Sequence, residues 1–383
     1  MSHPVEIFQK LPPDAKNVCF LHSGHKSILT YNPVETFQSN DDIKGLEKFL
    51  TKHKKHQIIG YLSYDLAYEL YNIKQHAKND LKLPNMYFHA FEKWQEWENS
   101  TNDFEIYDQK QYSSKNFQTT ISKENYASAY KKIKNYITEG DIYQLNLTHR
   151  LEGETEMPAR TLFCKIIKSN PVDFLAYIEG DGFEILSASP ERFIKITGDK
   201  IETCPIKGTR PRGATKKEDE KFKKELIESE KEAAELNMIT DLLRNDIGKI
   251  AKTGTVKVEG HRLIQECPTV WHTYSKITGE IKTSPLEALL SMLPGGSITG
   301  CPKKRAIEII DEVEPTTRSI YTGVIGHIEP SGDLDFNIAI RTVIKKGEKL
   351  YLQVGGGIVK DSGEEAEFEE TLQKAASFMK ILC

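Results

Sequence analysis

The chain has 383 residues, 38% of them hydrophobic and 28% charged, a balance typical of a water-soluble globular protein. Its formal net charge of −4 gives no general attraction to nucleic acid or anionic lipid, so we expect neither nucleic acid nor a membrane as a partner. No apolar stretch approaches the length needed to span a bilayer, and the amino terminus lacks a secretion pattern. The six cysteines form no Cys-x-x-Cys pair, which favours a reducing, cytoplasmic location.

The first hundred residues have the pattern of folded structure. The periodicity predicts a helix over 43–53 and a strand over 58–64. A polar segment rich in turn formers then runs from about 97 to 120. We therefore expect an N-terminal lobe over 1–115, part of the same α+β body, and a catalytic domain over 116–383.

The middle of the chain mixes helices and strands. Apolar residues spaced at a helical period predict a helix from Ser122 to about Gly140, and strands follow over 142–148, 174–178, 183–187 and 200–203. Residues 216–250 are charged and helical in period, without proline and without glycine before Gly248. We predict one long helix there.

The last part of the chain continues this mixture. We predict, in order, a strand at 256–258, a helix over 285–292, a loop over 294–302, a helix through 310, strands over 323–328, 335–344 and 349–355, and a final helix from 364. Direct turns between strands, together with long helices, favour an α+β fold over a strictly alternating parallel fold.

A lysine and a glutamate are candidates for covalent and acid chemistry. Lys207 lies in Pro205-Ile-Lys-Gly-Thr-Arg-Pro-Arg-Gly213, which we expect to be a loop, and a neutral lysine amine held near other cations is a nucleophile. Glu191 stands in a turn before it, where partial burial would suit it to protonate a leaving oxygen. Taken singly, a solvated lysine and an ion-paired glutamate remain the commoner alternatives.

Two Glu-x-x-Glu pairs are candidates for a metal site. Glu232 with Glu235, and Glu367 with Glu370, each share one helical face because their spacing is three. Two such faces opposed would offer the carboxylate oxygens that Mg²⁺ prefers. Helices rich in Glu and Lys also produce this spacing on a solvated face, so that alternative stays open.

Three further features suit an anionic or polar ligand. Gly355, Gly356 and Gly357 follow an expected strand, and with Arg341 on the preceding strand they could bind a carboxylate, although a tight turn is the default for such a run. His272 could orient or protonate a substrate, or could be satisfied by the backbone. Gly295–Ala306 looks like an anion-binding start of a helix with Lys303 facing the ligand, but it lacks the spacing of a nucleotide P-loop.

Taken together, these motifs resemble the chorismate-utilising enzyme family from about Lys123 to the carboxyl terminus. The resemblance implies an α+β fold with two large, orthogonally packed antiparallel sheets flanked by helices. It also implies a cleft that holds Mg²⁺ and chorismate, with Glu235 and Glu370 as the principal metal ligands and Glu232 and Glu367 beside them.

The same resemblance assigns roles to the remaining candidates. Arg341, Tyr321 and the backbone of 355–357 would hold the enolpyruvyl carboxylate of chorismate. Thr299 and His272 would line the pocket, and Glu191 would protonate the C4 hydroxyl.

Two positions then separate members of the family. Isochorismate-forming members have a water-activating lysine where this chain has Gln144, which cannot serve as that base. Anthranilate synthases have alanine in the Pro-Ile-x-Gly-Thr motif, where this chain has Lys207. The resemblance thus implies amination of chorismate at C4 to 4-amino-4-deoxychorismate, for para-aminobenzoate and folate synthesis, through a Lys207 adduct at C2.

No glutaminase motif is found in the sequence, so we expect ammonia from a separate glutamine amidotransferase subunit. The alternatives are anthranilate synthase component I, an isochorismate or salicylate synthase, and a silent chorismate-binding subunit. The last would have lost an acid, nucleophile or ligand, yet all of these candidates are present.

Overall fold

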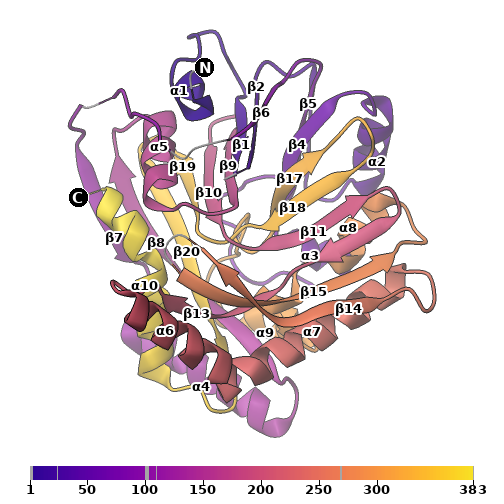
Figure 1. Ribbon diagram of the computed structural model, residues 1–383, viewed down its shortest axis with the longest axis vertical. Coiled ribbons are helices and arrows are strands. Elements are labelled where there is room, and N and C mark those ends of the chain that lie inside the picture. Colours follow the sequence, from indigo (N-terminus) through magenta and orange to yellow (C-terminus); the bar gives the residue numbers. More distant parts are fainter. Residues whose placement is uncertain (1–2, 24, 100–102, 109, 268–269, 383) are drawn as a thin grey trace.

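A computed structural model describes residues 3–382 except 24, 100–102, 109 and 268–269. Its framework is two ten-stranded antiparallel sheets, A and B (Figure 1). Sheet A has the order β16 (Gly300–Cys301), β8 (Gln144–Thr155), β20 (Lys349–Ile358), β19 (Thr342–Lys346), β10 (Glu184–Ser189), β9 (Phe174–Glu179), β1 (Cys19–His22), β2 (Lys26–Thr30), β6 (Gln95–Glu98), with β7 (Ser114–Thr119) paired to β8. Sheet B has the order β13 (Ile206–Pro211), β15 (Val270–Glu280), β12 (Lys200–Thr203), β11 (Arg192–Thr197), β18 (Leu334–Ile338), β17 (Val324–Ile328), β4 (Gln57–Leu62), β5 (Met86–Phe91), β3 (Glu35–Ser39), with β14 (Lys257–Glu266) paired to β15.

Helices flank both sheets. They are α1 (Pro4–Gln9), α2 (Ile43–Lys52), α3 (Leu66–Leu70), α4 (Lys123–Glu139), α5 (Ala159–Ser169), α6 (Lys216–Glu228), α7 (Glu230–Ile250), α8 (Pro285–Met292), the 3-10 turn η1 (Gly296–Ile298), α9 (Lys303–Val313) and α10 (Glu364–Ile381). In the described part of the chain, no helix combines the length and apolar character required to cross a bilayer. The expected α+β fold of two large antiparallel sheets with flanking helices is confirmed.

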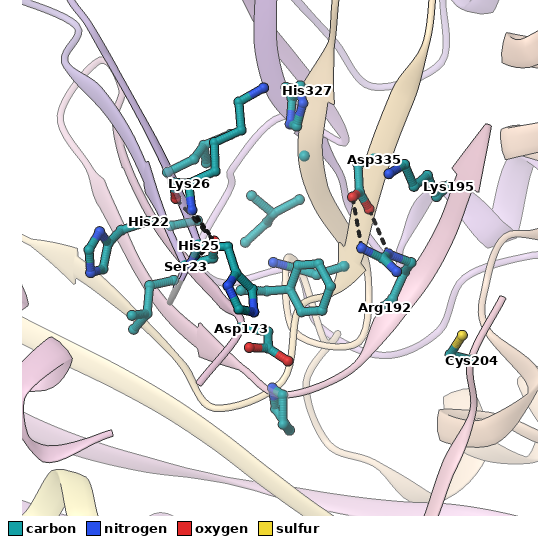
Figure 2. Close-up of a pocket in the computed structure, with 18 of the residues that line it drawn as sticks. His22, Ser23, His25, Lys26, Asp173, Arg192, Lys195, Cys204, His327 and Asp335 are labelled. Atoms are coloured by element: carbon teal, nitrogen blue, oxygen red, sulfur yellow. Dashed lines mark hydrogen bonds and ion pairs between the residues drawn. The ribbon is translucent and has the colours of Figure 1, made fainter. Parts of the chain in front are cut away.

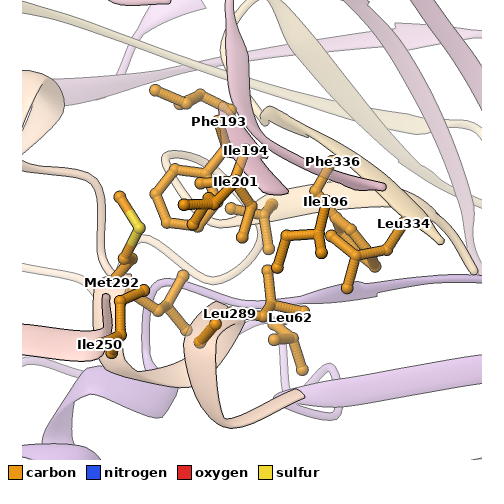
Figure 3. Packing of buried hydrophobic residues seen from close by; sticks show 14 of the residues in the cluster. Leu62, Phe193, Ile194, Ile196, Ile201, Ile250, Leu289, Met292, Leu334 and Phe336 are labelled. Atoms are coloured by element: carbon orange, nitrogen blue, oxygen red, sulfur yellow. The ribbon is translucent and has the colours of Figure 1, made fainter. Parts of the chain in front are cut away.

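Hydrophobic clusters lie between the sheets and beneath the helices. Between the sheets, Ile185 of β10 belongs to the same cluster as Tyr61 of β4 and Ile325 of β17. On the outer side of sheet B, residues of α7 and α8 pack on β11, β12 and β18 (Figure 3). On the outer side of sheet A, α1, α5 and α10 contribute to a further cluster. Strand β4 is buried at every position because both faces of its sheet are covered.

Local signals account for several boundaries. Helix α4 begins after Ser122, whose side chain accepts a hydrogen bond from the backbone N–H of Asn125, and ends at Gly140, which adopts a left-handed φ of 86°. Asp42 caps α2 in the same way through Gly45. The helices expected over 43–53 and from Ser122 are thus confirmed.

The single helix expected over 216–250 is wrong, because the chain breaks at Ser229. Ser229 has an extended backbone (φ −68°, ψ 109°) and its side chain caps the next helix through the N–H of Glu232. A serine that bonds to its own backbone neighbours competes with helix continuation, and here the cap prevails. Glu232 therefore lies in the first turn of α7, rather than in the middle of a helix.

Three more expectations need correction. The strand expected over 335–344 is two strands, β18 in sheet B and β19 in sheet A, with Arg341 in the break at a left-handed φ of 51°. Lys207 lies in strand β13, not in a loop. The glycines 355–357 lie within β20 instead of following it, because β8 continues to pair with them after β19 has ended its pairing at Leu352.

The N-terminal strands are shared between the sheets. β1, β2 and β6 belong to sheet A, whereas β3, β4 and β5 belong to sheet B. Residues 1–115 therefore contribute to the same framework as the rest of the chain, and the boundary near 115 stays a prediction.

Candidate active site

The site forms where the chain crosses between the two sheets. Glu191 stands between β10 of sheet A and β11 of sheet B, and Arg341 stands between β18 of sheet B and β19 of sheet A. The two crossings are hydrogen-bonded to each other: the N–H of Ile338 donates to the carbonyl of Glu191 at 3.0 Å, and the N–H of Ala188 to that of Arg341 at 3.0 Å. The left-handed backbone of Arg341 is thus part of the turn that joins the sheets.

The carboxyl group of Glu191 is buried, with 7% of the residue exposed. Burial raises its pKa to about 7, although the charge of Lys207 and a hydrogen bond from Ser297 act in the opposite direction. The Ser297 hydroxyl donates to Glu191 Oε1 at 3.1 Å. A carboxyl group with a pKa near neutrality can serve as a proton donor at physiological pH. The sequence does not single out Ser297, because nothing in a loop sequence shows which distant carboxylate a serine will contact.

Lys207 is held in an irregular part of strand β13. The register of β13 against β15 shifts between Lys207 and Thr209, where Gly208 has a φ of 81°. The Thr273 hydroxyl donates a short hydrogen bond to the carbonyl of Lys207. The Lys207 charge acts on the carboxyl groups of both Glu191 and Glu370, so this lysine lies within electrostatic reach of the acid candidate and of α10.

Glu232 and Glu235 come from the first turns of α7. Arg210 Nη1 donates to Glu232 Oε1 at 2.7 Å, while Glu232 Oε2 is buried and has no hydrogen-bond partner among the residues that the structure describes. A Cβ on Gly208 would lie 3.0 Å from that Oε2, so the carboxylate packs against the backbone beside Lys207. Lys231 lies 4.0 Å from Glu235.

Glu367 and Glu370 come from α10 and lie near the glycine run. A Cβ on Gly356 would be 3.1 Å from Glu367 Oε2. Burial raises the pKa of Glu367. The Glu370 side chain is about half exposed, and Lys374 and Lys231 outweigh its partial desolvation and lower its pKa. Because Lys231 belongs to α7, the charge of one helix acts on a carboxyl group of the other.

These carboxylates suit a hard cation in chemistry but are not gathered around one point. Among the described residues, no group of three or more His, Cys, Asp or Glu side chains is close enough to hold a metal ion. The donor set is nevertheless all carboxylate, and the buried, unpartnered Oε2 of Glu232 is an oxygen that a ligand would satisfy. In donor chemistry, the residues therefore fit Mg²⁺.

Gln144 begins strand β8 beside the glycine run. Gly357 pairs with Asn146 in the β8–β20 register, and a Cβ on Gly357 would lie 2.8 Å from Gln144 Nε2. Gln144 is 2% exposed, and its Oε1 accepts no hydrogen bond from the described residues. The glycine thus gives room for an amide whose carbonyl oxygen remains available.

The remaining predicted residues lie beside segments that have already been described. His272 of β15 is 2.9 Å from the Thr209 hydroxyl through Nδ1, and burial lowers its pKa. Thr299 is buried, and its carbonyl accepts from the N–H of Asn146 at 2.9 Å. Tyr321 is buried one residue before Thr322, whose N–H donates to Ala339 at 2.8 Å, next to the crossing that contains Arg341.

A buried ion pair is hydrogen-bonded to both β8 and η1. Arg318 and Glu314 have side chains that are 1% and 3% exposed, and Arg318 Nη2 lies 2.7 Å from Glu314 Oε1. Arg318 also donates to the carbonyls of Ile298, at 3.0 Å, and Asn146, at 2.5 Å. The N–H of Thr148 donates to Glu314 Oε1 at 2.9 Å. One arginine therefore connects the two segments that precede Thr299 and follow Gln144.

Lys303 does not face an anionic ligand, contrary to expectation, because its charge is paired within the chain. It is 8% exposed, and its Nζ lies 2.8 Å from Asp246 of α7 and 2.9 Å from the carbonyl of Met292. A buried lysine requires such a partner, and Asp246 lies too far away in sequence to suggest it. Lys303 thus connects α9 to α7.

A separate cavity of about 590 Å³ lies between the sheets (Figure 2). It is lined among others by Asp173, Arg192 and Asp335, and Arg192 forms a bidentate pair with Asp335 at 3.0 and 3.1 Å. Ile206 lines it, while Lys207, its neighbour along β13, has its side chain on the other face of the strand. No predicted site residue lines this cavity.

Comparison with known proteins gives a family and close relatives. The model of the family described as "chorismate binding enzyme" matches residues 13–380. Aminodeoxychorismate synthase component 1 of Bacillus subtilis (strain 168) is 31% identical, over 99% of this chain and 94% of the relative. Anthranilate synthase component 1 of Acetivibrio thermocellus is 43% identical over 69% of this chain, but the match spans only 54% of that relative's length. The crystal structure of anthranilate synthase component I from Streptococcus pneumoniae TIGR4 superposes with a TM-score of 0.82 at 26% identity, covering 98% of this chain and 97% of that one.

Proposed function

The chain belongs to the chorismate-binding enzyme family, and from this premise we propose that it aminates chorismate at C4 to give 4-amino-4-deoxychorismate. The observation that carries the proposal is the buried Glu191 carboxyl, with a pKa raised to about 7 by burial, within reach of the Lys207 charge. An acid and a nucleophile adjacent to each other suit a reaction in which one group leaves as another adds.

The reaction proceeds by two displacements. Lys207 first passes a proton to Glu191, which leaves a neutral amine and a protonated acid. The Lys207 amine then adds to C2 of chorismate, the ring double bond shifts, and the C4 hydroxyl leaves as water with the proton of Glu191. Ammonia then adds at C4, the double bond shifts back, and the C2–N bond to Lys207 breaks. The proton that ammonia loses returns to the Glu191 carboxylate, so the enzyme ends in its starting state.

Gln144 supports ammonia rather than water as the second nucleophile. Its side chain is buried, and Oε1 is an unpartnered acceptor beside Gly357. An amide cannot take a proton from water as a lysine amine can, but its carbonyl oxygen accepts a hydrogen bond from ammonia. Ammonia needs no general base to be nucleophilic, which fits a glutamine here.

Glu235 and Glu370 would hold Mg²⁺, with Glu232 and Glu367 beside them. When bound, the ion would supply positive charge that neutralises the ring carboxylate of the substrate and fixes its position. Arg341 and the backbone of 355–357 would hold the second carboxylate. The ammonia would come from a separate glutamine amidotransferase, a proposal supported by the relatives' names as component 1 of their enzymes.

Formation of anthranilate is the second candidate. It is favoured by the 43% identity to the Acetivibrio thermocellus anthranilate synthase component 1. That reaction would release pyruvate and leave an aromatic product, so the two candidates differ in products that are simple to separate.

The test is to incubate the purified chain with chorismate, Mg²⁺ and ammonium at mildly alkaline pH and to identify the product by mass and by conversion with an aminodeoxychorismate lyase. We expect 4-amino-4-deoxychorismate from the wild type and strongly reduced formation by Lys207→Ala, Glu191→Gln and Glu235→Ala. Lys200→Ala removes an exposed lysine in β12 and should leave the rate unchanged. Anthranilate with pyruvate, or isochorismate formed without ammonium, would overturn the proposal.

A further inference from the structure

Three of the four glutamates proposed for Mg²⁺ already have a cationic partner within the chain. Glu232 is paired with Arg210 at 2.7 Å, Glu370 with Lys374 at 2.8 Å, and Glu235 with Lys231 at 4.0 Å. Carboxylates gathered in one region repel one another unless positive charge lies between them. These arginine and lysine side chains thus supply positive charge to the glutamates, as a bound metal ion would.

The Arg210–Glu232 pair is the least exposed of the three. Its side chains are 29% and 18% exposed, compared with 40% and 53% for Lys374 and Glu370. Arg210 Nη1 also donates to the carbonyl of Thr209 at 2.9 Å, which fixes the guanidinium close to its own backbone. A charge-assisted hydrogen bond of this length, partly shielded from water, is stronger than one at the surface.

Only one oxygen of Glu232 is used by this pair. Oε1 accepts from Arg210, whereas Oε2 is buried against the backbone of Gly208 and has no partner in the described part of the chain. The carboxylate is therefore held by the arginine with one oxygen free, and moving that oxygen away from the Gly208 backbone toward a cation would lengthen or break the Arg210 hydrogen bond.

We propose that Arg210 is a built-in counter-ion that competes with the divalent cation for Glu232, so that metal binding is an exchange of one positive partner for another. Lys231 and Lys374 do the same for Glu235 and Glu370 to a smaller extent, because they are more exposed. The inference rests on the proposed Mg²⁺ role of these glutamates. It makes Arg210, three residues after Lys207, a determinant of metal affinity.

Mg²⁺ affinity measured by isothermal titration calorimetry on the full chain without chorismate tests this exchange. Arg210→Gln removes the charge but keeps a polar side chain, and we expect Mg²⁺ to bind about three- to tenfold more tightly than to the wild type, the range for losing a partly buried competing pair. Arg210→Lys retains the charge and should stay within about twofold of the wild type. Lys252→Gln, which removes an equal charge paired with Asp199 and Glu280, is the matched control and should change nothing.

Far-UV circular dichroism establishes that each variant is folded before titration. Unchanged or weaker Mg²⁺ binding by folded Arg210→Gln would overturn the inference, since Arg210 would then organise Glu232 and not compete for it. A wild type that takes up no Mg²⁺ would overturn both this inference and the proposed metal role. Amination itself is judged separately, by the product assay.

Discussion

Removal of Arg318 tests how far a single buried ion pair maintains the site. Arg318→Met keeps most of the side-chain volume but leaves Glu314 charged in a place where only 3% of its side chain is exposed. Breaking a buried pair on one side costs about 3–5 kcal/mol, and the abandoned carbonyls of Ile298 and Asn146 add about 1 kcal/mol each. We therefore expect the free energy of unfolding to fall by about 5–7 kcal/mol.

The assay is equilibrium urea unfolding followed by circular dichroism, with midpoints compared among variants. Replacing both partners, as in Glu314→Gln with Arg318→Met, removes the unpaired charge and leaves an amide oxygen for the Thr148 N–H, so it should recover at least half of the loss. Arg305→Met is the control, because Arg305 is 37% exposed and its two ion pairs lie at the surface. That change should cost less than about 1 kcal/mol. A loss from Arg318→Met no larger than that of the control would refute the reasoning.

Three further outcomes follow from the same geometry. The pKa of Glu191 is raised from 4.5 to about 7, so kcat/KM at saturating ammonia should decline above about pH 7 as the acid ionises. The stability that the protonated Glu191 contributes to the folded state is complete below pH 4.5 and should be lost as the pH rises through 7. Glu191→Gln should flatten this slope when unfolding is measured as a function of pH. Gly357→Ala should lower the amination rate at least about tenfold, because its Cβ would lie 2.8 Å from Gln144 Nε2, whereas Gly248→Ala, with open space around it, should leave the rate unchanged. Ser229→Ala should lower the free energy of unfolding by about 1 kcal/mol through loss of the α7 cap, and Ser229→Asp should restore it; equal stabilities in urea would contradict the capping role.

Local patterns predicted the elements whose boundaries are set locally. The helix after Ser122 could be predicted because the cap and Gly140 are adjacent to it in sequence. The break at Ser229 could not, since the helical period continues on both sides and serine is tolerated within helices. Arg341 was expected on a strand for a similar reason: the apolar pattern of 335–344 does not reveal that the chain leaves one sheet for the other.

The sequence predicts which residues take part in the site better than it predicts the contacts between them. Glu191 and Lys207 were identified from their neighbours in sequence, and the structure brings them into electrostatic reach. Ser297, Arg210 and the partner of Lys303 depend on pairings between distant segments, which neither spacing nor composition contains. Long-range register, set by packing of whole sheets, decides those contacts.

The strand order also constrains how the protein can be made. β19 and β20 lie between β10 and β8 in sheet A, and β17 and β18 lie between β11 and β4 in sheet B. During synthesis, every earlier strand of both sheets leaves the ribosome before the strands that join the two halves of each sheet exist. Unpaired strand edges are sites of aggregation, so the nascent chain must be protected until β20 emerges. Truncation before β17 would leave both sheets divided, with the halves of each unable to pair.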